Sequence, residues 1–253
     1  MRLLTCVLAL CAPLTFHASA GAVPTELTVR VIAKDGLFVG TMAGGVRITV
    51  KDAESGELLA QGIAEGSVGN IGRILKTARS RGVLLSDADS ARFTTVLDLT
   101  EPRRIVVEAF GPLAYPASAN TVSASQWLVP GKSVSDGDGW VLEMPGFFVE
   151  IDTPLQDEAL DKGAVDLSVH VTMMCGCPVV PGGLWDAEQY EMAVILKRDG
   201  TLVGEEPLEY AGKQSQFKAA LALEAGSYEA IVYAYDPVNG NTGVDRVSFT
   251  IAE

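Results

Sequence analysis

The chain has 253 residues, of which 32 are acidic and 19 are basic, so its formal net charge is −13 at pH 7. This acidic balance argues against nucleic acid and anionic membrane surfaces as partners, because both would repel the protein.

The first 20 residues predict an export signal. Arg2 precedes an apolar run over 3–14, and the small residues Ala18-Ser19-Ala20 follow it, as in a cleaved secretory signal. The run is too short to span a bilayer, and no later stretch approaches the roughly 20 apolar residues that a spanning helix requires. We therefore expect a periplasmic or extracellular protein with no membrane insertion. The signal carries one basic residue and no acidic one, so cleavage leaves a charge of −14.

Residues 21–135 predict a first β-sandwich domain. The run 27–33 alternates between two faces, 46–50 alternates again, and 52–56 supplies a turn into a returning strand. Such alternation, broken by Gly, Asp, Asn and Pro, is typical of strands. Further strands are predicted at 58–60, 93–99, 104–110 and 121–129.

Four segments of this region form a recognisable pattern. They are Gly-Val-x-Ile-x-Val-x-Asp ending at Asp52, Ser-Gly-Glu-Leu-Leu-Ala ending at Ala60, Ile105-Val-Val-Glu-Ala-Phe-Gly111 and Leu128-Val-Pro-Gly131. Over roughly residues 26–131 the pattern resembles transthyretin-like or carboxypeptidase-regulatory-like sandwich domains. The resemblance implies an accessory or binding module and brings no catalytic residue with it.

One segment of the first domain departs from the β pattern. Residues 71–81 predict about three turns of helix, on which Arg73, Lys76 and Arg79 are neighbours. This basic patch offers a docking point for an anionic partner. The preceding glycine-rich stretch, 66–72, lacks the Gly-Lys-Ser/Thr ending of a phosphate loop, so we interpret it as a flexible loop leading into a capping helix.

Residues 136–145 predict a linker, and 146–253 predict a second β-sandwich. The linker begins with Asp136-Gly-Asp-Gly139 and lacks the further oxygen ligands of a calcium loop. Tyr228 stands at the start of a strand, two residues before the small Ala230, which is the arrangement of a tyrosine corner. Strands are expected at 147–151, 165–174, 192–198, 201–206, 217–223, 228–235 and 247–251. The strand pattern of residues 146–253 resembles immunoglobulin-like, fibronectin-like and cadherin-like modules, which implies a fold but no ligand.

Every cysteine and histidine of the mature chain falls within eight residues. Cys6, Cys11 and His17 belong to the signal, which leaves His170, Cys175 and Cys177. Two cysteines separated by one residue cannot provide a disulfide framework for a whole domain, so apolar burial must hold the domains together.

Three interpretations of this segment remain open. Strand alternation puts Met173 and Cys175 on the core face and His170 and Met174 on the other face. Thiolate, thioether and imidazole are soft ligands, so Cys175, Cys177, Met173, Met174 and His170 are candidate ligands of copper(I). Alternatively, Cys175 and Cys177 form a local disulfide that is structural or redox-active, or the residues are ordinary core and surface.

The loop after the cysteines carries Trp185 and Asp186 at an end of the sandwich, where immunoglobulin-like modules have their binding loops. These two residues are candidates for partner contact, although Trp185 can also fold back over the sandwich. No Gly-x-Ser-x-Gly elbow is present, so we do not expect an enzyme. The sequence favours an exported, non-enzymatic binding or accessory protein that contacts a protein or surface partner through loops of its second domain. The alternative is a periplasmic copper-binding protein that uses the Cys-Gly-Cys segment.

Overall fold

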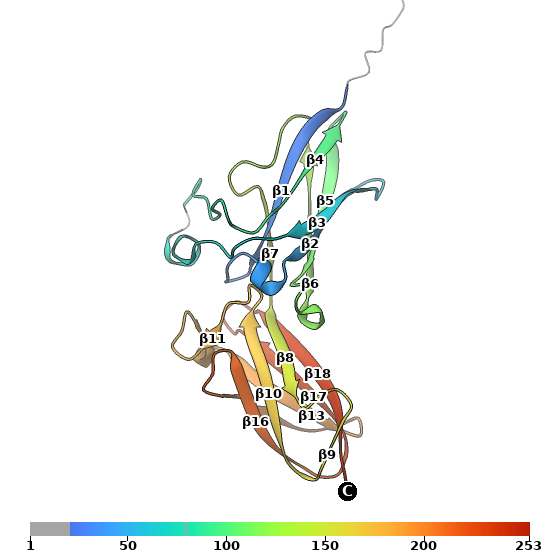
Figure 1. The fold of residues 1–253 in the computed structure, drawn as a ribbon, viewed down its shortest axis with the longest axis vertical. Helices are drawn as coiled ribbons and strands as arrows, with labels where there is room; N and C mark the ends of the chain where they lie inside the picture. Colours follow the sequence, from blue (N-terminus) through green and yellow to red (C-terminus); the bar gives the residue numbers. More distant parts are fainter. Residues whose placement is uncertain (1–20, 79) are drawn as a thin grey trace, which may run out of the picture.

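The computed structural model describes residues 21–78 and 80–253, which form two β-sandwiches stacked end to end (Figure 1). The expected signal, with Cys6, Cys11 and His17, lies outside the described residues, as does Arg79. The predicted all-β fold class is confirmed, because the helices in the described ranges are limited to short turns. None of these helices is long and apolar enough to cross a membrane.

The first domain contains seven strands in two sheets, of orders β4-β1-β7 and β3-β2-β5-β6. Their alternating sequence explains the packing, since Val46, Ile48 and Val50 of β2 are buried while the intervening residues are exposed or partly exposed. The strands are β1 (Val23–Ala33), β2 (Val46–Asp52), β3 (Leu58–Ala64), β4 (Phe93–Leu99), β5 (Arg103–Gly111), β6 (Asn120–Leu128) and β7 (Trp140–Met144). All six strands that the sequence predicts here are present. The more specific transthyretin-like or carboxypeptidase-regulatory-like assignment stays a prediction.

Strand β7 lies inside the segment predicted to be the linker. It pairs in parallel with β1, from Val29 opposite Trp140 to Ala33 opposite Met144. The segment therefore completes a sheet of the first domain, and the connection between the sandwiches is reduced to Pro145 and Gly146. A five-residue strand between turn residues carries too weak a periodic signal to be separated from a linker by sequence.

The helix expected over 71–81 is shorter than predicted. Only Gly72–Lys76 (η2) is helical, and Thr77 returns to an extended conformation with φ −97° and ψ 131°. Arg73 donates a hydrogen bond from Nη1 to the Ser86 carbonyl at 2.7 Å, so this basic side chain helps to hold the connection between β3 and β4. Docking of an anionic partner at this segment stays a prediction.

Asp138 anchors the same connection on the first domain. Its carboxylate accepts the backbone N–H groups of Leu85 and Ser86 at 2.9 and 2.8 Å and the Ser86 hydroxyl at 2.7 Å. Burial by itself would raise the pKa of Asp138, but these hydrogen bonds outweigh it and lower the pKa. Arg30, which is buried, donates to the Ser90 carbonyl at 2.5 Å. The charged side chains of Arg30 and Asp138 thus fix the connection between β3 and β4, in which η2 is the main regular element.

The second domain has the strand order of an immunoglobulin-like sandwich. Its sheets are β15-β16-β10-β8 and β14-β13-β17-β18-β9, which correspond to the DEBA and C′CFG sheets of that fold. The strands are β8 (Phe147–Thr153), β9 (Glu158–Leu160), β10 (Gly163–Met173), β11 (Val179–Val180), β12 (Trp185–Asp186), β13 (Glu191–Arg198), β14 (Thr201–Pro207), β15 (Glu209–Tyr210), β16 (Gln216–Leu223), β17 (Gly226–Tyr235) and β18 (Thr242–Ile251). The seven strands predicted from the sequence are confirmed, and four short strands are added.

The tyrosine corner is present at the start of β17. The Tyr228 hydroxyl donates to the Glu224 carbonyl at 2.9 Å, and the ring stacks on Phe249 with centroids 5.6 Å apart. Ala230, two residues later, is fully buried. The hydrogen bond fixes the turn into β17, as the local sequence predicts.

The two sandwiches share one continuous buried core, and polar contacts close the junction. Asn241, which is fully buried, donates from its amide to the Lys34 carbonyl at 3.1 Å and accepts the Gly146 N–H at 3.0 Å. The Ser118 hydroxyl donates to the Val149 carbonyl at 2.8 Å. The junction is therefore built from both domains and from the connection between them.

Candidate functional site

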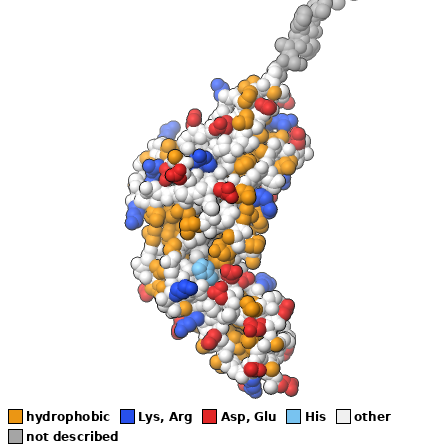
Figure 2. Space-filling model, in the orientation of Figure 1, with side chains coloured by type: hydrophobic (Ala, Val, Ile, Leu, Met, Phe, Trp, Pro, Cys, Tyr) orange, Lys and Arg blue, Asp and Glu red, His pale blue; other side chains and the backbone are white. Residues whose placement is uncertain are grey.

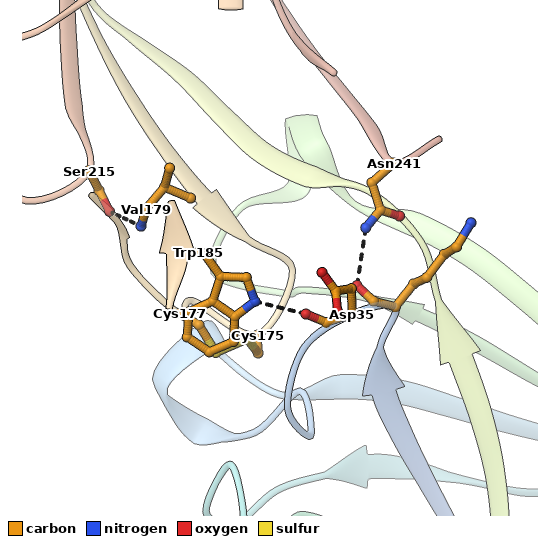
Figure 3. Close-up of a disulfide and its surroundings, with 8 residues drawn as sticks. Asp35, Cys175, Cys177, Val179, Trp185, Ser215 and Asn241 are labelled. Carbon is orange, nitrogen blue, oxygen red and sulfur yellow. Dashed lines mark hydrogen bonds between the residues drawn. A yellow bond between two sulfur atoms is a disulfide. The ribbon is translucent and has the colours of Figure 1, made fainter. Parts of the chain in front are cut away.

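The Cys-Gly-Cys segment forms a tight turn between β10 and β11. Cys175 and Cys177 are joined as a disulfide, with their Cα atoms 5.2 Å apart (Figure 3). Gly176 between them has φ +75°, a left-handed conformation that glycine adopts without steric cost. The turn is closed by a hydrogen bond from Met173 N–H to the Cys177 carbonyl at 3.0 Å. The geometry agrees with the disulfide interpretation of the sequence.

This disulfide lies at the junction between the domains. Cys175 is fully buried and Cys177 is 5% exposed. A Cβ atom at Gly36 of the first domain would approach Cys175 Sγ to 3.3 Å, so the turn after β1 packs directly against the disulfide. Trp185 is also 5% exposed, and its indole N–H donates to the Asp35 carbonyl at 2.7 Å (Figure 3). The end of the second sandwich that carries these residues thus faces the first domain.

The candidate copper ligands are not all brought together. His170 lies on the outer face of β10, where Nδ1 is 3.0 Å from Gln216 Nε2 and the ring is 5.7 Å from the Phe148 ring. Met173 and Met174 are fully buried. Within residues 21–78 and 80–253, no three His, Cys, Asp or Glu residues are grouped as metal ligands. Copper binding by the Cys-Gly-Cys segment stays a prediction.

Asp186 is engaged within its own loop. Its carboxylate accepts the backbone N–H groups of Glu188 at 3.1 Å and Gly182 at 2.8 Å, and it caps the short helix η4 (Ala187–Gln189). These hydrogen bonds and the burial of Trp185 fix the conformation of the loop over residues 182–189. Contact of Trp185 or Asp186 with a separate partner stays a prediction.

Tyr190, which follows η4, lies between the junction and a groove on the side of the second domain. Its ring packs edge-on against Phe147, with centroids 5.0 Å apart. Burial, and then the charges of Asp236, Asp35 and Asp186, raise its pKa well above the ordinary value for tyrosine. The phenol is therefore neutral at physiological pH, and Tyr190 contributes no charge to the groove that it lines.

The groove has a volume of about 650 Å³ and was not anticipated from the sequence. It forms where the chain crosses from β14 in one sheet to β15 in the other, and a hydrogen bond from Leu208 N–H to the Met192 carbonyl holds the crossing at 2.9 Å. The remaining wall comes from Pro181, from η4, from the starts of β13 and β16, and from Tyr233 of β17. The lining residues are Pro181, Ala187, Glu188, Tyr190, Glu191, Met192, Ala193, Glu205, Pro207, Leu208, Tyr210, Phe217 and Tyr233.

The groove combines aromatic and acidic side chains. The Tyr233 hydroxyl donates to Glu205 Oε1 at 2.7 Å, and this hydrogen bond, with burial and the nearby Glu191, raises the pKa of Tyr233 to about 12. Tyr210 packs edge-on against Phe217, with centroids 5.9 Å apart. These tyrosine and glutamate side chains can bind apolar or cationic groups through their ring faces and carboxylates. Because these residues are scattered over positions 181–233, no local motif reveals them.

No protein-family model and no curated protein matches the chain. Among solved structures, an engineered protein shares 17% identity over 50% of this chain with a TM-score of 0.33, and the chain spans 24% of its length. Fibronectin(III)-like modules of Clostridium thermocellum CbhA share 9% identity over 90% of this chain and 93% of their own, with a TM-score of 0.28. The Dpr2 Ig1–Ig2 structure, in complex with DIP-Theta, shares 13% identity over 90% and 99%, with a TM-score of 0.28. Because these similarities are weak, the assignment of the second domain rests on its strand order and tyrosine corner.

Proposed function

We propose that the protein is an exported, non-enzymatic interaction protein whose second domain binds a protein partner in the side groove, while the first domain acts as a support. The observation that carries this proposal is the groove. Three tyrosines, Tyr190, Tyr210 and Tyr233, line it over the buried Phe217, together with three glutamates, in a space of about 650 Å³. Protein interfaces are enriched in exposed aromatic residues, and a few such anchors in a concave site supply most of the binding energy.

The junction contacts favour the groove over the loop end of the sandwich. In immunoglobulin variable domains, the B–C and F–G loops bind the ligand. Here the corresponding connections, 174–190 and 236–241, meet the first domain through Trp185 and Asn241. The later part of the 174–190 connection still contributes Pro181, Ala187 and Tyr190 to the groove. The 174–190 connection, which contains the loop with Trp185 and Asp186, thus lines the proposed groove with its later residues while Trp185 contacts the first domain.

Export and the absence of catalysis are parts of the proposal that rest on the sequence. The pattern of residues 1–20 supports export. The one histidine of the mature chain is 3.0 Å from Gln216 through its Nδ1 atom, on the outer face of β10, and it is not among the residues that line the groove. A role in copper binding remains an alternative prediction, which metal analysis of the exported protein and of a Cys175→Ser, Cys177→Ser variant would test.

A photocrosslinking amino acid at position 210 tests the proposed function. Tyr210 is 36% exposed at the groove, and Trp127 of the first domain, 59% exposed, gives a control position outside it. Extracytoplasmic proteins of the native host should form an adduct with position 210 and not with position 127. The adduct identifies a partner, whose binding is then measured with purified proteins.

The purified partner should bind the wild-type protein and not the Ala187→Arg variant, in which a long side chain enters the groove from its wall without removing a core residue. Equal adducts at positions 210 and 127, or unchanged affinity for the Ala187→Arg variant, would contradict the proposal. Circular dichroism and thermal unfolding of the variant show whether its fold is intact.

A further inference from the structure

Resting on the proposed function, we propose that the groove recognises an extended cationic segment of the partner, through Lys or Arg side chains. The groove is lined by Glu188, Glu191 and Glu205, and no Lys or Arg is among its described lining residues. Within residues 21–78 and 80–253, Glu188 and Glu191 take part in no ion pair. Their carboxylates are therefore free to pair with charges that a ligand brings.

The aromatic residues add to this preference for cations. An ammonium or guanidinium group is attracted to the face of an aromatic ring, and more strongly where water is partly excluded. The phenols of Tyr190 and Tyr233 remain protonated at physiological pH, so neither adds a charge of its own. Glu205 accepts the Tyr233 hydroxyl with Oε1, which orients the carboxylate at the groove. Rings and carboxylates thus act on the same cationic group.

The charge of the whole chain is concentrated on the domain that carries the groove. Residues 146–253 hold 18 of the 32 acidic residues and six of the 19 basic ones, a net charge of −12. Residues 21–145 hold 14 acidic and 12 basic residues, a net charge of −2. Acidic side chains are spread over the second domain on the face seen in Figure 2. A field of this sign attracts a cationic partner and speeds its association.

A second hollow favours an extended segment over a small cation. It has a volume of about 570 Å³ and meets the groove at Pro207, which lines both. Asp166, Glu206 and Glu209 line it, with Lys218 as its basic residue. Acidic side chains therefore continue along the surface on both sides of the crossing between β14 and β15. A chain with several basic residues fits such a track, whereas a single small cation fills a part of one hollow.

The test uses blocked, fluorescent nonapeptides with a Ser and Leu background that carry three Lys, three Arg, three Gln or three Glu residues. Their binding to the mature protein is measured by fluorescence anisotropy at low and high salt. We expect the Lys and Arg peptides to bind, and binding to weaken as salt screens the charges. The Glu188→Gln, Glu191→Gln variant should bind them about tenfold more weakly.

A matched variant, Glu150→Gln, Glu253→Gln, removes the same charge from exposed positions of the same domain outside the groove. It should change the affinity by less than about twofold, as expected for distant screened charges. An equal loss in both variants would show nonspecific attraction and overturn the proposal. Competition by millimolar tetramethylammonium that abolishes binding would overturn it in favour of a small cation.

The Ala187→Arg variant separates this inference from the proposed function. If Gln or Glu peptides bind, are blocked by Ala187→Arg and are insensitive to Glu188→Gln, Glu191→Gln, the groove is a binding site but its cation preference is wrong. If peptides of every class bind the Ala187→Arg variant as they bind the wild type, both proposals fail. Binding of Lys and Arg peptides that is lost in Ala187→Arg and in the groove glutamate variant supports both.

Discussion

The replacement of Trp185 by Phe tests the junction between the two sandwiches. The indole N–H bond to the Asp35 carbonyl, 2.7 Å long, joins the domains, and phenylalanine has no N–H to replace it. Loss of such a hydrogen bond costs about 1 kcal/mol. The smaller ring also leaves part of a buried contact surface unfilled, which costs about 1 kcal/mol more. We therefore expect the free energy of unfolding to fall by about 2 kcal/mol.

Urea denaturation of a protein that begins at residue 21, followed by far-UV circular dichroism, measures this change. Trp127→Phe is the matched control, because the same substitution is made at a side chain that is 59% exposed on β6. It should alter the free energy by less than about 0.5 kcal/mol. A Trp185→Phe variant that is no less stable than Trp127→Phe would refute the inference that this side chain ties the second domain to the first.

Three further results are expected from the fold. Tyr228→Phe should lower the free energy of unfolding by about 1 kcal/mol in urea denaturation, because it removes the hydrogen bond of the tyrosine corner; an unchanged midpoint would show that the bond contributes nothing. Cys175→Ser, Cys177→Ser should cost about 1–2 kcal/mol through the small loop that the disulfide closes, and free-thiol titration of the unreduced wild type should find neither thiol. Because the pKa of Asp138 is lowered in the folded state, its carboxylate stabilises the fold at any pH above its unfolded-state pKa of about 4, and this stabilisation is lost as the pH falls through the folded-state pKa. Asp138→Asn should therefore reduce stability at pH 7 and remove part of the loss seen on acidification, and identical acid profiles for both proteins would contradict this.

The strands could be predicted because their signal is local. The residues of β10 alternate between apolar and more polar side chains. The apolar ones are buried in the structure: Val165, Leu167, Val169 and Val171. The tyrosine corner was predictable for the same reason, since its hydroxyl and the carbonyl it contacts are four residues apart. The helix over 71–81 was predicted too long, because helical periodicity says little about where the surrounding structure ends a helix.

The junction and the groove could not be predicted, because they are formed by contacts between residues far apart in the sequence. Sequence alternation predicts Met174 on the outer face of the strand, yet Met174 follows the last residue of β10 and is fully buried. Tyr210, Phe217 and Tyr233 belong to three different strands and Tyr190 lies between η4 and β13, and the crossing between the sheets brings them to one groove. Their grouping follows from strand order and register, which are long-range properties.

The sequence by itself determined that this is an all-β chain of two sandwiches, with Cys175 and Cys177 in one turn and its charge strongly acidic. Alternation, turn residues and composition are sufficient for these conclusions because each acts over a few residues or over the whole chain. Only the tertiary structure decided that the cysteine turn and Trp185 are enclosed at the junction and that an open groove lies beside them. These features arise from the stacking of two domains and the crossing of two sheets, which join residues far apart in the sequence.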